Sequence, residues 1–155
     1  MSELPPIDES PVPDAARLLR LAAGAGPTEA ELYGPPEPVL ALGRWLRAAV
    51  PGAVDLAGTD RERWPQRPGS LAVEVTDEPE LFVTLRRGRL VIAGSAGVID
   101  RLGEIVQDVG VKALDWRWAP TERRATVAPV EGADPPVRAE SLALHVASAY
   151  PLDPP

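Results

Sequence analysis

The chain has 155 residues, of which 45% are hydrophobic and 25% charged, and this length and composition predict one globular domain. It contains no cysteine, which excludes disulfides, thiolate zinc sites and cysteine nucleophiles. The net charge of −7 lies mostly near the ends, since residues 1–14 carry four acidic residues and no basic one. The body of the chain is close to neutral and lacks the basic surface typical of nucleic-acid-binding proteins.

The sequence shows neither a targeting signal nor a membrane-spanning segment. The first residues show no basic region followed by an apolar stretch, which is the pattern of a signal peptide. No apolar run approaches the length of about 20 residues that a membrane span needs. We therefore expect an acidic, soluble, cytoplasmic protein that contacts neither membrane nor nucleic acid.

Residues 14–50 predict a helical hairpin. Asp14 is a suitable N-cap for a helix in "AARLLRLAA", which Gly24 would end. A connector follows, with one helical turn at Thr28–Leu32, and a second helix runs from about Glu37 to Ala49. The second helix has one apolar stripe, which consists of Val39, Leu42, Leu46 and Val50.

The clearest strand pattern lies in the middle of the chain. "AVDLA" is open to interpretation as a short strand, and "LAVEV" alternates as a strand does. "LFVTLRRGRLVIAG" predicts a hairpin over 81–94 with a two-residue turn at Arg87-Gly88, which pairs Arg86 with Arg89. In this register one face of the hairpin is wholly apolar and carries Leu81, Val83, Leu85, Leu90 and Ile92.

The turn "GSAG" at residues 94–97 leads into a helix from Ser95 to Val109, which is expected to end at Gly110. Glycines before a helix can hold a phosphate, but neither the G-x-G-x-x-G nor the G-K-[ST] pattern is present. We therefore interpret Ser95 as the cap of the helix. The apolar stripe of this helix consists of Ile99, Leu102, Val106 and Val109.

Three further strands are expected after this helix. "KALDWRWA" predicts a strand that carries Leu114, Trp116 and Trp118 on one face. "RRATVAPV" is its expected partner. "ESLALHVASA" is the last strand, and its inward residues are Leu142, Leu144 and Val146.

Together these elements predict an α+β fold, in which an antiparallel sheet of about five to six strands carries a central helix and an N-terminal helical hairpin on one face. Residues 14–150 form the single expected domain, with the helical hairpin in 14–50 and the sheet and central helix in 53–147. Residues 1–13 are expected to be a flexible, proline-rich arm and 151–155 a disordered tail. No internal repeat of fixed period is visible.

Five residues are candidates for contact with a protein partner. Asp77, Glu78 and Glu80 gather in "DEPE" without the spacing of a calcium loop, which favours an acidic loop that meets a basic partner over a metal site. Trp116 and Trp118 share a strand face in "WRW", where they either fill the core or anchor an interface.

The alternative candidates are contacts for an anion or another ligand. Arg86, Arg87 and Arg89 gather at the hairpin tip, where they either clamp a phosphate or acidic partner or keep the hairpin soluble. His145, the only histidine, is expected on the less buried face of the last strand, where it is a surface residue or a general base. No G-x-S-x-G elbow supplies a nucleophile, and we expect no catalytic set, metal or cofactor.

The segment "RGRLVIAGSAGVIDRLGEIV", followed later by "AESLALHVAS", resembles a small α+β immunity-protein family of bacterial polymorphic toxin systems. The resemblance covers about half of the chain and rests on a strand that ends in a small-residue turn, a leucine-bearing helix and a late strand. It implies a bacterial protein that binds and blocks a toxin. It implies no catalytic residues.

Three functional hypotheses follow from the sequence. The first is a non-catalytic protein-binding protein, which the resemblance narrows to an immunity protein with a toxin as its partner. The second is a small ligand-binding domain or enzyme that uses the exposed sheet face around His145. The third is a structural or assembly subunit with proline-rich tethers, and the sequence leaves the oligomeric state open.

Overall fold

The computed structural model describes residues 20–23, 29–55, 70–87, 89–115 and 123–148. These residues form two helices and eight strands, so the α+β class is confirmed. In chain order the elements are β1 (Arg20–Ala23), β2 (Glu29–Gly34), α1 (Pro36–Ala48), β3 (Gly52–Asp55), β4 (Ser70–Val75), β5 (Phe82–Arg86), β6 (Arg89–Gly94), α2 (Ala96–Asp115), β7 (Arg123–Val127) and β8 (Ala143–Ser148).

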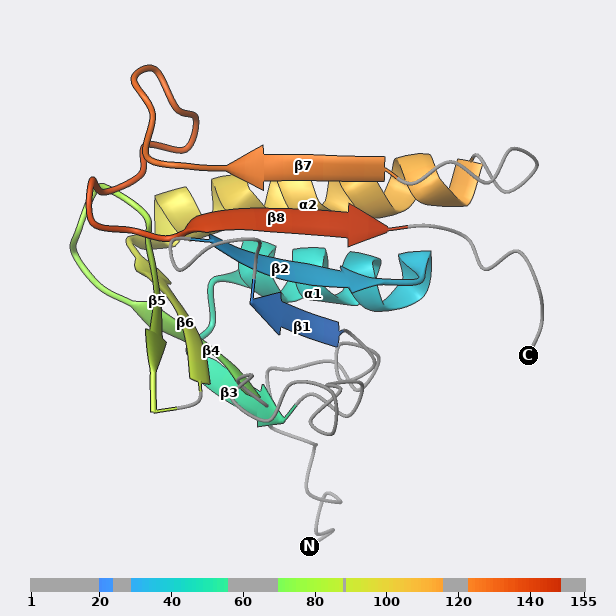
Figure 1. Cartoon of the computed structure of the whole chain (residues 1–155), viewed down its shortest axis with the longest axis horizontal. Helices are drawn as coiled ribbons and strands as arrows, with labels where there is room; N and C mark the ends of the chain where they lie inside the picture. The colour runs from blue at the N-terminus through green and yellow to red at the C-terminus, as the bar shows by residue number, and fades with distance from the viewer. Residues whose placement is uncertain (1–19, 24–28, 56–69, 88, 116–122, 149–155) are drawn as a thin grey trace, which may run out of the picture.

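The strands form two four-stranded sheets rather than one (Figure 1). Sheet A has the order β1-β2-β8-β7 and sheet B the order β3-β4-β6-β5. In each sheet the two central strands are parallel and each edge strand is antiparallel to its neighbour. The expectation of a single antiparallel sheet of five to six strands is therefore wrong, because alternation reveals which face of a strand is buried but not which strand lies beside it.

The same order of elements occurs twice along the chain. β1-β2-α1-β3-β4 and β5-β6-α2-β7-β8 are both strand–strand–helix–strand–strand units. Each sheet takes the first strand pair of one unit and the second pair of the other. The sequence shows no repeat of fixed period because α2 is longer than α1 and the connections within the two units differ in length.

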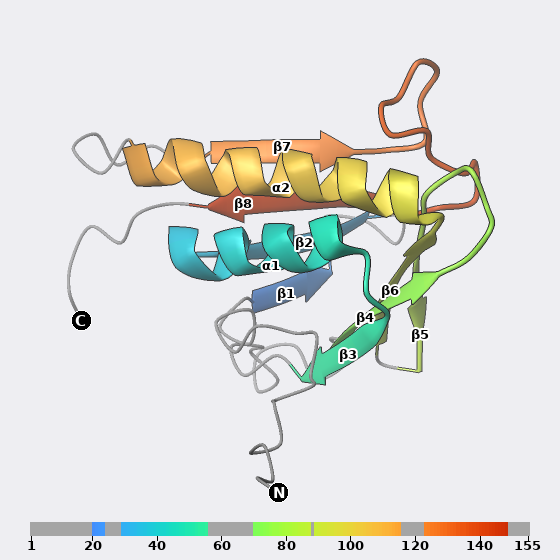
Figure 2. The ribbon, with the colours of Figure 1, turned by 180° about the vertical axis from the view of Figure 1, so that it is seen from behind.

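The two helices run antiparallel and meet at glycines. A Cβ on Gly43 would lie 2.8 Å from the backbone nitrogen of Gln107, and one on Gly103 would lie 2.6 Å from that of Arg47. Only glycine allows the two backbones to approach this closely. Figure 2 shows α1 and α2 side by side over the inner face of sheet A, with sheet B beyond their ends.

α2 continues past the end that the sequence predicts. Gly110 lies inside the helix and packs against Leu40 of α1, so it serves helix contact rather than termination. The helix ends at Asp115, and the predicted strand "KALDWRWA" is wrong where it is described, since Leu114 is helical. Residues 116–119 of that segment, with Trp116 and Trp118, lie outside the described residues.

The N-terminal helical hairpin is also wrong in its described part. Residues 20–23, at the end of the predicted first helix, form β1, while residues 14–19 lie outside the described residues. Of the expected helical turn at Thr28–Leu32, residues 29–32 are instead part of β2, where Ala30 and Leu32 are buried at alternate positions, and Thr28 lies outside the described residues. Pairing with β8 on one side and β1 on the other outweighs local propensity here.

The second predicted helix and the central hairpin are confirmed. α1 matches the predicted helix to within one residue, and Val39, Leu42 and Leu46 of the predicted stripe are buried, whereas Val50 lies beyond the end of the helix and is exposed. β5 and β6 pair in the predicted register, with Arg86 opposite Arg89. Of the apolar face, only Leu85 is exposed (40%), because it lies near the end of the hairpin.

The last two strands are confirmed, with a different partnership. β7 pairs with β8 in sheet A, and residues 112–115, the described part of the segment predicted as its partner, are helical. Leu144 and Val146 face the core as predicted, whereas the partly buried Leu142 precedes β8. One apolar core joins both sheets and both helices, and its largest fully buried side chain is Trp45, whose Nε1 donates to the carbonyl of Val50 at 2.9 Å.

Candidate functional site

The three hairpin arginines predicted as ligand contacts line one pocket of about 620 Å³ on sheet B. The antiparallel register places Arg86 opposite Arg89, and Arg87 forms the turn with a left-handed φ of 51°. The pocket is completed by three residues of β4 and β6, namely Ser70, Glu74 and Val91. We call this the arginine pocket.

Charge in the arginine pocket is only partly compensated. Arg86 forms an ion pair with Glu74 at 2.9 Å, and the Nε of Arg89 donates to the hydroxyl of Ser70 at 3.1 Å. Within the described part of the chain, Arg87 has no ion pair or hydrogen bond and Arg89 has no carboxylate partner. Three guanidinium groups thus face one carboxylate, which suits a bidentate anion such as a carboxylate or phosphate.

Ser70 and Glu74 belong to the pocket although the sequence did not suggest them. They approach the arginines because β4 pairs with β6 in parallel, with Ser70 beside Arg89. β5 separates these two strands in the sequence, and parallel pairing between strands that are not consecutive leaves no local signal.

The acidic loop predicted for partner contact lies at the other end of sheet B, between β4 and β5. Asp77, Glu78 and Glu80 are all exposed, and none has an ion pair with another described residue. The loop is tied to the start of α2, because the N–H of Ser95 donates to the carbonyl of Glu78 at 2.8 Å. The N–H of Thr76 likewise donates to the carbonyl of Gly94 at 2.8 Å. The carboxylates are therefore held on an ordered backbone.

The "GSAG" turn behaves as the cap that the sequence suggests. The N–H of Val98 donates to the hydroxyl of Ser95 at 3.4 Å, and the N–H of Ile99 donates to its carbonyl at 3.0 Å. A Cβ on Gly97 would meet nothing closer than the Ser95 hydroxyl at 4.0 Å. The backbone of Glu78 is hydrogen-bonded to this turn, and the negative charge of the Glu78 side chain disfavours the binding of an anion nearby.

His145 does not join the hairpin arginines. It lies on β8 in sheet A and is not among the described residues that line the arginine pocket of sheet B, so the structure does not bring His145 together with the three arginines there. Its Nε2 lies 2.9 Å from a carboxylate oxygen of Glu29 and its Nδ1 lies 2.9 Å from the hydroxyl of Thr126. These two hydrogen bonds link three adjacent strands, β2, β8 and β7, across the outer face of sheet A. We call this set of side chains, Glu29, His145 and Thr126, the clamp.

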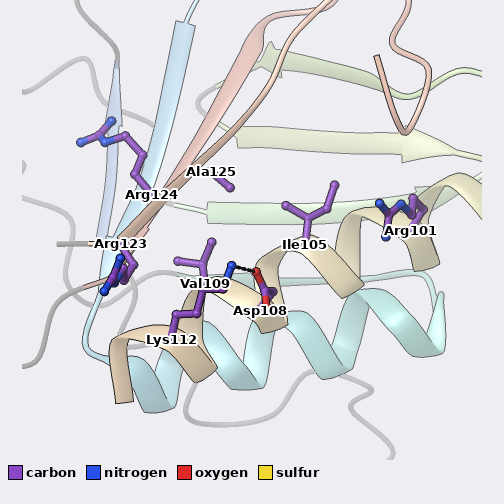
Figure 3. Close-up of a pocket in the computed structure, with 8 residues that line it drawn as sticks. All are labelled: Arg101, Ile105, Asp108, Val109, Lys112, Arg123, Arg124 and Ala125. Carbon is purple, nitrogen blue, oxygen red and sulfur yellow. Dashed lines mark ion pairs between the residues drawn. The ribbon is translucent and has the colours of Figure 1, made fainter. Parts of the chain in front are cut away.

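A second pocket, of about 650 Å³, lies between α2 and β7 (Figure 3). We call it the α2–β7 groove. It is lined by Arg101, Ile105, Asp108, Val109 and Lys112 of α2 and by Arg123, Arg124 and Ala125 of β7. The helical residues recur at the spacing of one helix face, a stripe that the sequence analysis did not identify.

Ion pairs fix several of the charged side chains of this groove. Lys112 pairs with Asp108 at 2.9 Å, as Figure 3 shows. Arg101 contacts Asp134 at 3.1 Å and Glu104 at 2.8 Å. The hydrogen bonds that Arg101 donates to Asp134 and then to Glu104 raise its pKa above the ordinary value for arginine, so this side chain stays charged.

The described residues contain neither a metal site nor a membrane-spanning helix. No three His, Asp or Glu side chains there come close enough together to hold a metal ion. Neither α1 nor α2 is long and apolar enough to cross a membrane. No family model, curated protein or solved structure matches the chain.

Proposed function

We propose that this protein is a non-catalytic protein-binding protein and that the arginine pocket receives acidic side chains of its partner. The observation that carries the proposal is the excess of guanidinium charge at Arg87 and Arg89. Arginine is the residue best suited to bind carboxylates across an interface, because its planar fork matches the two oxygens.

The chemistry of the pocket favours binding over reaction. Among its described lining residues, the one hydroxyl, on Ser70, accepts a hydrogen bond from Arg89, and the one carboxylate, on Glu74, pairs with Arg86. A nucleophile needs a base within hydrogen-bond reach, and among the described residues no hydrogen bond joins the Ser70 hydroxyl to the Glu74 carboxylate.

The acidic loop supports a defined orientation of the partner. Positive charge at the hairpin tip and negative charge at Asp77, Glu78 and Glu80 lie at opposite ends of sheet B. Two patches of opposite sign select one orientation of a partner with the complementary pattern. The resemblance to immunity proteins makes a bacterial toxin the proposed partner.

The proposal is tested with the protein encoded by the neighbouring gene. We expect it to bind the full chain in calorimetry, and the double variant Arg87→Glu, Arg89→Glu to weaken binding at least about tenfold, or about 1.4 kcal/mol. Arg44→Glu on the exposed side of α1 is the matched control. No binding by the neighbour would refute the toxin as partner, and equal binding by the double variant would refute the pocket as the contact.

A second candidate, a site for a small anion, is favoured by the volume of the pocket. Its 620 Å³ falls within the range of about 300–1,000 Å³ that is common for ligand sites. Pyrophosphate and citrate are suitable probes. A rise in the unfolding temperature that the Arg87→Glu, Arg89→Glu variant loses would favour this candidate over a protein partner.

A further inference from the structure

We propose that Glu74 fills a third carboxylate position in the arginine pocket, so that the pocket receives two acidic side chains of a partner protein rather than three. The proposal rests on the function proposed above, since it takes the pocket to be the contact for acidic groups. It adds how many such groups the pocket receives and which residue limits their number. Glu74 is thus a specificity-determining residue.

The first observation is the path of the ion pair between Glu74 and Arg86. The two residues stand on β4 and β5, and β6 lies between these strands. In the register of the sheet, Glu74 lies beside Ala93 of β6, and Arg86 lies beside the first residue of that strand. The contact of 2.9 Å therefore crosses β6 near Val91, which lines the pocket. Glu74 and Arg86 meet across the pocket, and the carboxylate takes one of its three guanidinium groups.

The second observation is that the three guanidinium groups differ in what they bind. The charge of Arg86 is compensated by Glu74. Arg89 donates its Nε to the hydroxyl of Ser70, which is neutral and leaves the charge of the guanidinium uncompensated. Arg87 has no ion pair or hydrogen bond with another described residue. Two guanidinium groups are therefore open to acidic groups of a partner, while the third already holds one.

The third observation is the exposure of the ion pair. The side chains of Glu74 and Arg86 are both about half exposed, and pairs with such exposure contribute little to stability. The fold therefore does not depend on Glu74. A third acidic side chain of the partner would have to share Arg86 with Glu74, and the repulsion between the two carboxylates disfavours this arrangement.

The probes are glutarate and tricarballylate, which has the skeleton of glutarate with one additional carboxylate. Their dissociation constants for the full chain are measured by NMR titration at about 0.01 M salt, where the screening length is about 30 Å. For the wild-type chain we expect tricarballylate to bind no more than about threefold more tightly than glutarate, because Arg86 is occupied. For Glu74→Gln we expect a ratio of at least about tenfold, because Arg86 is then open to the third carboxylate. The same ratio in both proteins would overturn the proposal.

A double variant shows whether the effect depends on Arg86. In Glu74→Gln, Arg86→Gln the ratio should return to about threefold or less, because the guanidinium that receives the third carboxylate is gone. A ratio that stays high would show that Glu74 acts through the net charge of the pocket alone. Weaker binding of both probes by the single variant Glu74→Gln would show that Glu74 holds Arg86 in place for the ligand. Either result would overturn the proposal.

Glu104→Gln is the matched control. Glu104 is exposed to a similar degree and also pairs with an arginine, Arg101, but it does not line the pocket. The control removes the same charge and should leave the ratio of the two probes as in the wild-type chain. Circular dichroism checks that each variant is folded.

The variant Arg87→Glu, Arg89→Glu separates this proposal from the proposed function. If that variant loses both probes and Glu74→Gln leaves their ratio unchanged, the pocket remains an anion contact and only the role of Glu74 is refuted. If that variant binds both probes as the wild-type chain does, the pocket is not the anion contact and both proposals fail. Failure of both probes to bind the wild-type chain would overturn the role of Glu74, whereas the partner proposal is decided by its own calorimetric test.

Discussion

The two sheets share strand order and pairing but differ on their outer faces. In sheet A, polar residues of β2, β7 and β8 bind one another: His145 lies between Glu29 and Thr126, and Arg124 forms an ion pair with Glu31 at 2.6 Å. In the equivalent positions of sheet B, Arg89 starts β6 as Glu29 starts β2, and its described polar partner is a neutral hydroxyl. The difference teaches that a repeated framework can carry one outer face whose polar side chains are paired with one another and another whose charge is only partly compensated.

The largest losses of stability are expected from core substitutions at equivalent positions of the two strand–strand–helix–strand–strand units. Leu32 of β2 and Ile92 of β6 are the fourth residues of their strands, and both are fully buried. We expect Leu32→Ala and Ile92→Ala each to lower the free energy of unfolding by about 2–5 kcal/mol, because each leaves a cavity in the shared core. Urea denaturation measures both. A cost near zero at either position would break the equivalence.

The helix contact gives the next largest effect. Gly43→Ala and Gly103→Ala should each destabilise by about 1–3 kcal/mol, since the new methyl group meets backbone atoms that cannot move aside. Gly97→Ala, which meets open space in α2, is the matched control and should be neutral or stabilising by up to about 1 kcal/mol. Thermal unfolding of the three variants checks the order, and similar losses at all three would contradict the contact.

The clamp on sheet A should contribute less. Thr126→Val keeps the shape of the side chain and removes its hydrogen bond to His145, and we expect a cost of about 0.5–1.5 kcal/mol. Thr84→Val, on β5 of sheet B, is the control substitution at a strand threonine for which the described residues provide no side-chain hydrogen bond. Equal costs for the two variants, measured by urea denaturation, would show that the clamp adds nothing to the stability of sheet A.

The smallest effect is expected at the exposed ion pair. A double-mutant cycle on Glu31→Gln and Arg124→Gln should give a coupling of about 0.2–1 kcal/mol, because both side chains remain partly exposed. The coupling should shrink in 1 M salt, where the screening length falls to about 3 Å. A coupling that persists unchanged in salt would mean that the pair is better shielded than its exposure indicates.

Local features were predictable from the sequence, and distant pairings were not. The central hairpin and its register follow from alternation around a turn, and α1 follows from its apolar stripe. The division into two sheets depends on β2 pairing with β8 and β4 with β6, which no local pattern encodes. The end of α2 was predicted too early, at Gly110, because glycine occurs both where helices end and where two helices pack closely.

The candidate sites follow the same division. The three arginines are close in sequence, so the tip of the hairpin predicts their meeting. Ser70 and Glu74 join them only through the parallel pairing of β4. The α2–β7 groove was hidden because residues 112–119 were predicted as a strand, which removed Lys112 from the helix that carries Arg101.

The exchange of strand pairs between the two units has a consequence for synthesis on the ribosome. Sheet B can close once β6 has emerged, because all of its strands precede α2. In sheet A, by contrast, β2 must wait for β8, the last strand of the described chain, before its central pairing can form. During that interval β2 is paired with β1 at one edge, while the edge that later pairs with β8 has no strand partner. Pairings between strands so far apart in sequence are slow to form. The nascent chain therefore passes through a half-built state in which one sheet is complete and an early hairpin still exposes an unpaired edge.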